Sequence, residues 1–209
     1  MKLASKNTIF GNWPKRPPIK PTNEASGRPR EHLTRDEFLK LRMTLKKGNH
    51  SEKNELLLLL MGQHGLRVSE LIGLRWVDID VKAKTLSIRR LKNGIGGEHP
   101  LYRDESRLIS KLKRKQRPCD RDFIFKGYNN SAMTPNAVYK IIQQAGIDAG
   151  ISFPIHPHMC RHSTGYQLVN KGVPLVNIQQ YMGHRQIAST IIYTALDNMR
   201  FRKFDAIFS

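Results

Sequence analysis

The chain has few of the features that stabilise secreted or membrane-spanning proteins. Only two cysteines occur in 209 residues, Cys119 and Cys160, and they lie far apart and in no metal-ligand spacing. This argues against a disulfide framework and fits a reducing cytoplasm. The longest apolar run, Leu56 to Met61, is too short to cross a bilayer, and the N-terminus lacks the apolar segment of a secretory signal. We therefore expect a cytoplasmic protein with no membrane partner.

Acidic residues are also scarce relative to basic ones. The sequence holds 17 Asp and Glu against 36 Lys and Arg, which gives a formal net charge of +19. Such an excess favours a polyanionic partner, because neutralising phosphates releases condensed counterions. Nucleic acid is the favoured partner, although ribosomal proteins and proteins that bind membrane surfaces are basic too. Charge alone says nothing about catalysis.

The N-terminal 30 residues differ in composition from the rest of the chain. They contain five of the eleven prolines and seven basic residues, with Glu24 as their one acid, and show no apolar periodicity. This predicts a flexible basic arm over residues 1–31, which either contacts the partner or is an inert solvated tail. One folded domain is expected over residues 32–198, and a short tail over 199–209.

Helical signals dominate the folded part. Thr34 and Glu37 form a capping-box pattern at the start of the first helix, and the leucine run predicts a second helix buried on all sides. Gly65 is placed to end that helix in a left-handed turn. Further helices are predicted at 68–74, 103–116, 135–149, 157–172, 174–183 and 186–196.

Alternating residues predict a small antiparallel sheet. The pattern from Lys84 to Leu91 indicates a strand, three glycines (Gly94, Gly96 and Gly97) indicate a turn, and His99 to Tyr102 would form the return strand. Residues 123–125 are a further candidate strand. The predicted fold class is therefore mainly α with a small antiparallel β-sheet or hairpin.

Several polar motifs lie on these elements, and each by itself is weak evidence for a function. Arg67 could form an ordinary salt bridge to Glu70 on the same helix face. His158 and His162 share a helix face, but zinc needs three or four protein ligands, so core or capping histidines are the stronger interpretation. Tyr193, nine residues after His184, could simply pack on an amphipathic helix.

Taken together and in order, the motifs resemble the tyrosine recombinase (phage integrase) family. The motifs are His64-Gly65-Leu66-Arg67-Val68-Ser69-Glu70-Leu71, a hairpin lysine at Lys92, His158-Met159-Cys160-Arg161-His162, and Gly183-His184 followed by Tyr193. Met159-Cys160 departs from the family's usual residues but changes no polar group. The resemblance covers roughly residues 32–200. The stretches around Lys92 and His99-Pro100-Leu101 look most like the small recombinases that invert fimbrial promoter segments.

The resemblance implies the tyrosine recombinase catalytic-domain fold over residues 32–198 and a site-specific recombinase that cuts and rejoins DNA through a 3′-phosphotyrosine. In the family's pattern Tyr193 would be the nucleophile, and Arg67, Arg161 and His184 would bind the phosphate oxygens as a clamp. His158 would accept a proton, and Lys92 would be the general acid. Glu70 would hold Arg67 in place. Arginine suits the clamp because its planar fork binds oxyanions in bidentate fashion and keeps its charge. No metal or cofactor is implied.

The resemblance also implies partners. These are double-stranded DNA, other copies of the chain (a tetramer on synapsed DNA, weakly associated without it) and an accessory DNA-bending protein, with a location at the bacterial nucleoid. The tail residues Phe201, Phe204, Ile207 and Phe208 follow helical spacing. They would pack either on their own domain or on a neighbouring protomer.

Two other functions remain open at this point. A type IB topoisomerase uses the same chemistry but relaxes DNA without a specific site. A non-catalytic DNA-binding protein on the same fold would form no covalent adduct.

Overall fold

The computed structural model describes residues 31–48, 50–89 and 96–193. Within these ranges the helices are α1 (Arg35–Leu45), α2 (Ser51–His64), α3 (Val68–Ile72), α4 (Arg103–Gln116), α5 (Pro135–Asp148), α6 (Pro157–Asn170), α7 (Leu175–Met182) and α8 (Ala188–Ile191). The strands are β1 (Ile79–Asp80), β2 (Thr85–Ile88) and β3 (Gly97–Pro100), and short 3-10 turns occur at Trp76–Asp78 and Tyr128–Asn130.

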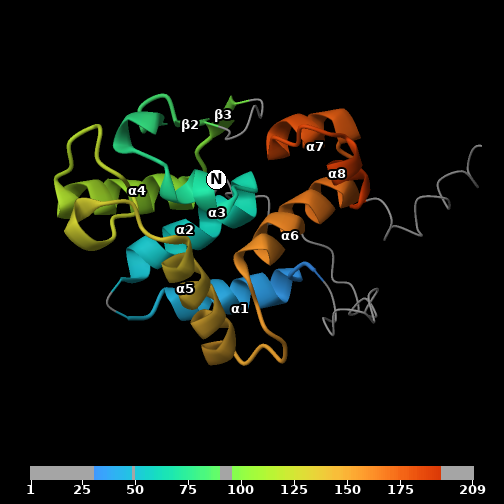
Figure 1. The fold of residues 1–209 in the computed structure, drawn as a ribbon, viewed down its shortest axis with the longest axis horizontal. Helices are drawn as coiled ribbons and strands as arrows, with labels where there is room; N and C mark the ends of the chain where they lie inside the picture. The colour runs from blue at the N-terminus through green and yellow to red at the C-terminus, as the bar shows by residue number, and fades with distance from the viewer. Residues whose placement is uncertain (1–30, 49, 90–95, 194–209) are drawn as a thin grey trace, which may run out of the picture.

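Helix α2 is the centre of the fold. Every residue from Glu55 to His64 is buried, because α1, α3, α4 and α6 all contact this helix (Figure 1). Full burial of each leucine side chain contributes about 1.5–3 kcal/mol. The burial on all sides that the leucine run predicted is confirmed. Functional groups at the C-terminal end of α2 are consequently held by the buried part of this helix.

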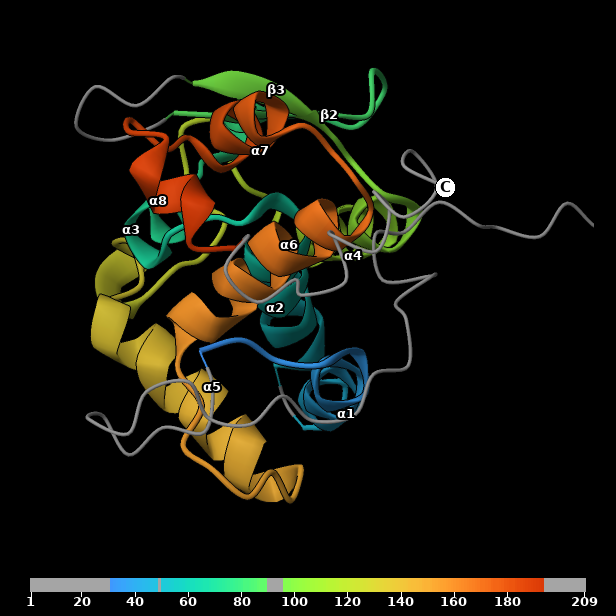
Figure 2. The same ribbon diagram turned by 90° about the vertical axis from the view of Figure 1, so that its right-hand side faces the viewer.

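The sheet is antiparallel in the order β1-β2-β3, with Leu86 of β2 opposite His99 of β3. Both residues are buried, while their neighbours along the strands are more exposed. Figures 1 and 2 show the sheet at one end of the molecule, near α7, and α1 with α5 at the other end.

Three details of the predicted sheet are corrected. Strand β1 was not predicted, because two residues are too few to show alternation. Gly97 lies in β3 and pairs with Ile88, so it is not a turn residue. The candidate strand at residues 123–125 is only an isolated bridge between Phe123 and Arg75.

Local end signals place the helices as predicted. Thr34 accepts a hydrogen bond from the backbone N–H of Glu37, whose carboxylate accepts from Thr34 N–H at 2.8 Å. Thr134 caps α5, which opens on Pro135. Gly65 and Gly183 have φ of +60° and +62° and end α2 and α7 in left-handed turns. These two glycine turns carry the candidate site.

Some predictions lie outside the described residues. They are the N-terminal arm up to residue 30, Lys92 with Gly94, the end of the last predicted helix and the tail over 199–209. Among the helices that are described, none combines the length and the apolar character needed to span a bilayer.

Candidate active site

The two glycine turns lie against each other. A Cβ atom added to Gly65 would lie 2.6 Å from the Sδ atom of Met182, the last residue of α7. The positive φ of Gly65 favours glycine at this position, and any larger residue would also have to displace the Met182 side chain. Arg67 follows the first turn and His184 follows the second. The fold therefore brings together two motifs that are more than a hundred residues apart in the sequence.

Arg161 of α6 binds both turns at once. Its Nη1 donates to the carbonyl oxygen of Gly65, and its Nη2 donates to the carbonyl oxygen of Met182 at 2.7 Å. Nη1 also lies 3.9 Å from Oε2 of Glu70. The residue is only 4% exposed. A buried guanidinium held by backbone carbonyls and a carboxylate is fixed in position and keeps its charge.

Arg67 has a different environment. Its Nη1 donates to Glu70 Oε1 at 2.8 Å, and its backbone N–H donates to Glu70 Oε2 at 2.9 Å. The Glu70 side chain is 1% exposed, whereas that of Arg67 is 36% exposed. The predicted ion pair is therefore present. It holds one edge of the guanidinium and leaves the side chain accessible to an anionic ligand.

Tyr193 follows α8 directly and is buried against α6. Its ring stacks at a 23° angle on His184, with 6.1 Å between centroids, and meets Tyr166 edge-on at 5.0 Å. At Gly165 of α6, an added Cβ would lie 2.4 Å from the Cζ atom of Tyr193. Burial raises the pKa of Tyr193 to about 12, and the positive charge of Arg161 opposes this increase.

The hydroxyl of Tyr193 lies 3.2 Å from Nδ1 of His162. The sequence predicts His162 as a core or capping histidine rather than a metal ligand, and nothing local to it signals a contact with a residue on another element. Burial, with smaller contributions from His158 and Arg161, lowers the pKa of His162 to about 4. Its ring is therefore neutral near pH 7 and can accept the phenolic hydrogen.

The other two predicted histidines occupy distinct places. His184 is 7% exposed, and its Nδ1 lies 2.9 Å from the hydroxyl of Thr190, which fixes the ring. His158 is exposed. Its pKa is lowered first by partial burial and then by the charges of Arg161 and Arg67, so it belongs to the same cluster as the arginines.

The structure thus gathers Arg67, Glu70, His158, Arg161, His184 and Tyr193 around the two turns, and adds His162. Lys92 is not among the residues described. In the described ranges, no group of three or more His, Cys, Asp or Glu side chains has an arrangement that could hold a metal ion.

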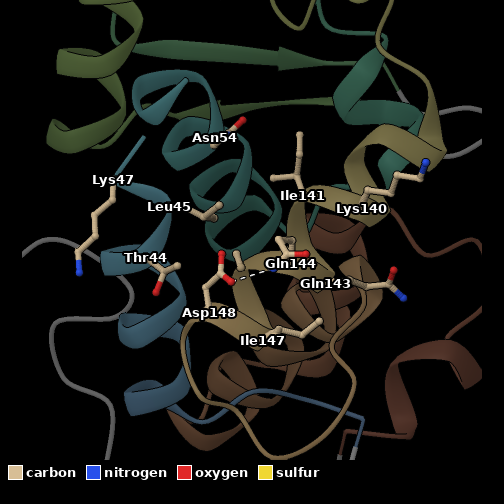
Figure 3. A pocket seen from close by; sticks show the side chains of 11 residues that line it. Thr44, Leu45, Lys47, Asn54, Lys140, Ile141, Gln143, Gln144, Ile147 and Asp148 are labelled. Atoms are coloured by element: carbon tan, nitrogen blue, oxygen red, sulfur yellow. Dashed lines mark hydrogen bonds between the residues drawn. The ribbon is translucent and has the colours of Figure 1, made fainter. Parts of the chain in front are cut away.

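A separate hollow of about 590 Å³ lies where α5 faces α1 and α2 (Figure 3). Lys47, Asn54 and Lys140 line it, and within it Gln144 Nε2 donates to Asp148 Oδ1 at 2.8 Å. None of its lining residues belongs to the arginine–tyrosine cluster. The hollow is therefore separate from the arginine–tyrosine cluster.

Comparison with known proteins decides the family. The sequence model of the phage integrase family matches residues 31–200. The chain belongs to this family. It is therefore a tyrosine site-specific recombinase by family, and the identification made from the order of the motifs is confirmed.

Two of its relatives are fimbrial regulators. The type 1 fimbriae regulatory protein FimB of Escherichia coli K12 is 37% identical over 182 residues, which cover 86% of this chain and 91% of FimB. The regulatory protein FimE of the same strain is 38% identical over 176 residues, covering 82% of this chain and 89% of FimE. The likeness to fimbrial recombinases that the sequence suggested is confirmed.

Solved recombinase structures share the fold. The XerH site-specific recombinase, bound to a palindromic difH substrate, superposes with a TM-score of 0.72 at 24% identity. The alignment covers 91% of this chain and 57% of XerH. The XerA recombinase gives a TM-score of 0.70 at 22% identity, over 85% of this chain and 65% of XerA. The mainly helical fold with a small antiparallel sheet is that of the recombinase catalytic domains.

Proposed function

We propose that this chain cuts and rejoins double-stranded DNA at a specific site, with Tyr193 as the nucleophile. The observation that carries the proposal is the position of its hydroxyl, 3.2 Å from a neutral histidine and beside the ring of His184, in a cluster anchored by Arg161. Tyr181, by contrast, donates its hydroxyl to the carbonyl oxygen of Gln63 at 2.9 Å and is engaged in a structural contact.

The cationic groups would stabilise the pentavalent phosphate. Arg67, Arg161 and His184 supply donors for the non-bridging oxygens, where negative charge grows in the transition state. Glu70 keeps the Arg67 guanidinium in place through its 2.8 Å ion pair. Loss of one such donor typically slows the chemical step by about 10²–10³-fold.

The bond changes balance without an external energy source. The phenolic oxygen of Tyr193 forms a bond to phosphorus while the bond from phosphorus to the 5′-oxygen breaks. The phenolic proton passes to a histidine, for which His158 is favoured by the family's motif and His162 by its contact with the hydroxyl. The 5′-oxygen takes a proton from Lys92. The 3′-phosphotyrosine bond keeps the energy for rejoining.

The partners and the domain limits are part of the proposal. The net charge of +19 supports double-stranded DNA as the partner. We assign residues 32–198 to the catalytic domain, 1–31 to a DNA-contacting arm and 199–209 to a tail exchanged between protomers of a tetramer assembled on synapsed sites. The motif resemblance to recombinases that invert fimbrial promoter segments favours inversion of a DNA segment, and it agrees with the likeness to the fimbrial regulators FimB and FimE. An accessory DNA-bending protein and a place at the nucleoid in the bacterial cytoplasm are further parts of the proposal.

A nicked suicide substrate that carries the cognate site tests the nucleophile. The wild-type chain should form a covalent protein–DNA adduct, and Tyr193→Phe should form none while it binds the same DNA. Tyr166→Phe is the matched control, because Tyr166 packs on the Tyr193 ring but holds no proposed chemical role. An adduct that persists in Tyr193→Phe, or that maps to Tyr181, would contradict the assignment.

A further inference from the structure

A cluster of buried polar side chains lies behind the Gly65 turn and has no part in the proposed chemistry. It contains His64 at the end of α2, His99 of β3, Glu105 near the start of α4, and the rings of Tyr102 and Tyr181. His64 and Glu105 are completely buried, and His99 is 5% exposed. Buried ionisable groups are costly, so their arrangement calls for a physical reason.

His64 and Glu105 form the core of this cluster. Nε2 of His64 lies 3.0 and 3.1 Å from the two carboxylate oxygens of Glu105. Nε2 is therefore within hydrogen-bond distance of both oxygens of the carboxyl group. Glu105 also accepts the backbone N–H of Tyr102 at 3.0 Å. The end of α2 is thereby fixed to the first turn of α4.

His99 extends the contacts to the sheet and to α7. Its Nδ1 lies 3.2 Å from Nδ1 of His64, which is within hydrogen-bond distance. The ring of His99 packs on that of Tyr181 with 4.2 Å between centroids. Tyr181 in turn donates its hydroxyl to the carbonyl oxygen of Gln63.

Consecutive residues before Arg67 are therefore each held by a different element. The Gln63 carbonyl is bound by α7, the His64 side chain by α4 and β3, and the Gly65 carbonyl by Arg161 of α6. Any shift of His64 would move the carbonyl that Arg161 binds and the backbone that leads to Arg67. Apolar residues of similar volume often replace a buried polar pair without loss of stability, so stability alone does not account for this cluster.

We propose that His64 and Glu105 are positioning residues for strand cleavage, which fix the Gly65 turn and through it the two arginines. The inference rests on the proposed function, in which Arg67 and Arg161 bind the scissile phosphate. Both side chains are completely buried, so neither is open to DNA. Their effect should therefore appear in the rate of cleavage of bound DNA and not in DNA affinity.

The first measurement is single-turnover cleavage of the nicked substrate at saturating protein, normalised to the folded fraction from thermal unfolding. Glu105→Gln should cut about tenfold more slowly with unchanged affinity, less than the roughly 10²-fold cost of a 1 Å misplacement. Glu55→Gln is the matched control. Glu55 is a buried carboxylate on the same helix that accepts from Arg42 Nε at 2.8 Å, far from the turn. Its variant should cut at the wild-type rate per folded molecule.

His64 gives an independent variant if Glu105→Gln does not fold. His64→Gln keeps a donor for Glu105, whereas His64→Leu removes both of the His64 contacts. The expected order of cleavage rates is wild type, then Gln, then Leu. Equal rates for the wild type and His64→Leu would overturn the proposal.

The second measurement separates positioning from general loss of stability. In a methylphosphonate at the scissile position, a methyl group replaces one non-bridging oxygen and removes one negative charge, so the substrate depends less on well-placed arginines. The defect of Glu105→Gln relative to wild type should shrink on this substrate, as should that of Arg67→Ala. An equal defect of Glu105→Gln on both substrates would overturn the positioning role.

Arg67→Ala distinguishes this failure from that of the proposed function. If its own defect is the same on both substrates, the arginine clamp is wrong and the proposed function fails at that step. If its defect shrinks and that of Glu105→Gln does not, only the positioning inference fails.

Discussion

The side chain of Tyr193 is closely enclosed by its neighbours. The residue is 2% exposed, and its ring fills the space left by the missing side chain of Gly165. Close packing of the ring on α6 therefore limits the access of solvent and reagents to Tyr193.

Replacing Gly165 with alanine should displace this ring. The added Cβ would lie 2.4 Å from Tyr193 Cζ, a distance that the packed ring cannot accommodate. We expect faster nitration of Tyr193 by tetranitromethane in the DNA-free variant, mapped by mass spectrometry. Gly146→Ala is the control, because the three atoms nearest to its Cβ would all belong to the Ile155 side chain, the first at 3.0 Å. Unchanged nitration of Tyr193 in Gly165→Ala would contradict the packing argument.

The protonation of His162 should make stability depend on pH. Its pKa in the folded state is about 4, below the ordinary value of 6.5, so the unfolded chain takes up the proton first as pH falls. The contribution to stability is present above pH 6.5 and is lost as pH falls toward 4. Denaturant unfolding at several pH values should show a smaller decrease over this window in His162→Asn than in the wild type.

His50 provides the comparison for that experiment. It is an exposed histidine before α2, so His50→Asn should leave the pH dependence of the wild type unchanged. A wild-type decrease that persists in full in His162→Asn would show that other groups cause it.

Among the helices and strands, the sequence best predicted the features that depend on a few neighbouring residues. The helix ends at Thr34, Gly65, Thr134 and Gly183 all agree with the structure, because a cap or a left-handed glycine acts on its own turn. The short strand β1 was missed because its existence depends on pairing with β2. A two-residue segment carries no periodicity of its own.

The contacts of the site also divide into local ones, which the sequence predicted, and contacts between elements, which it did not. The Arg67–Glu70 ion pair was predicted, since both residues belong to one helical turn. The two carbonyl contacts of Arg161 and the contact between His162 and Tyr193 join separate elements. Such contacts depend on how α6 packs against α2 and α7, and a single sequence does not reveal this packing. The motif order nevertheless named six of the residues that the structure gathers.

Lys92 lies between β2 and β3 in the sequence, and Ile88 of β2 pairs with Gly97 of β3. If Lys92 is the general acid, a substrate with sulfur in place of the bridging 5′-oxygen should bypass it, since a thiolate departs without a proton. Lys92→Ala should be slower by about 10²–10⁴-fold on normal DNA and near wild type on the sulfur substrate.

Two arginine variants serve as controls for this experiment. Arg67→Ala and Arg161→Ala act on non-bridging oxygens, which the sulfur leaves unchanged, so neither should be rescued. If sulfur does not restore cleavage by Lys92→Ala, the lysine binds phosphate and the acid is another residue.

Over the whole molecule, charge is the dominant property. Lys and Arg outnumber Asp and Glu by 36 to 17, and several of the acids are already paired internally, such as Glu55 and Asp104 with Arg42. The basic excess is therefore available to phosphates. Seven basic residues fall in the first 30, a stretch with one acid.

DNA affinity should consequently fall steeply with salt. With roughly six phosphate contacts, the logarithm of the binding constant should fall with the logarithm of salt concentration at a slope of about −5. Deleting residues 1–30 should make the slope shallower if the arm contacts DNA, because each contact contributes about −0.9. Replacing its seven lysines and arginines with glutamine keeps the length of the arm and should have the same effect. Fluorescence anisotropy with labelled DNA from 50 to 300 mM salt measures all three slopes. A slope that neither change alters would make the arm an inert tail and place the phosphate contacts in the folded domain.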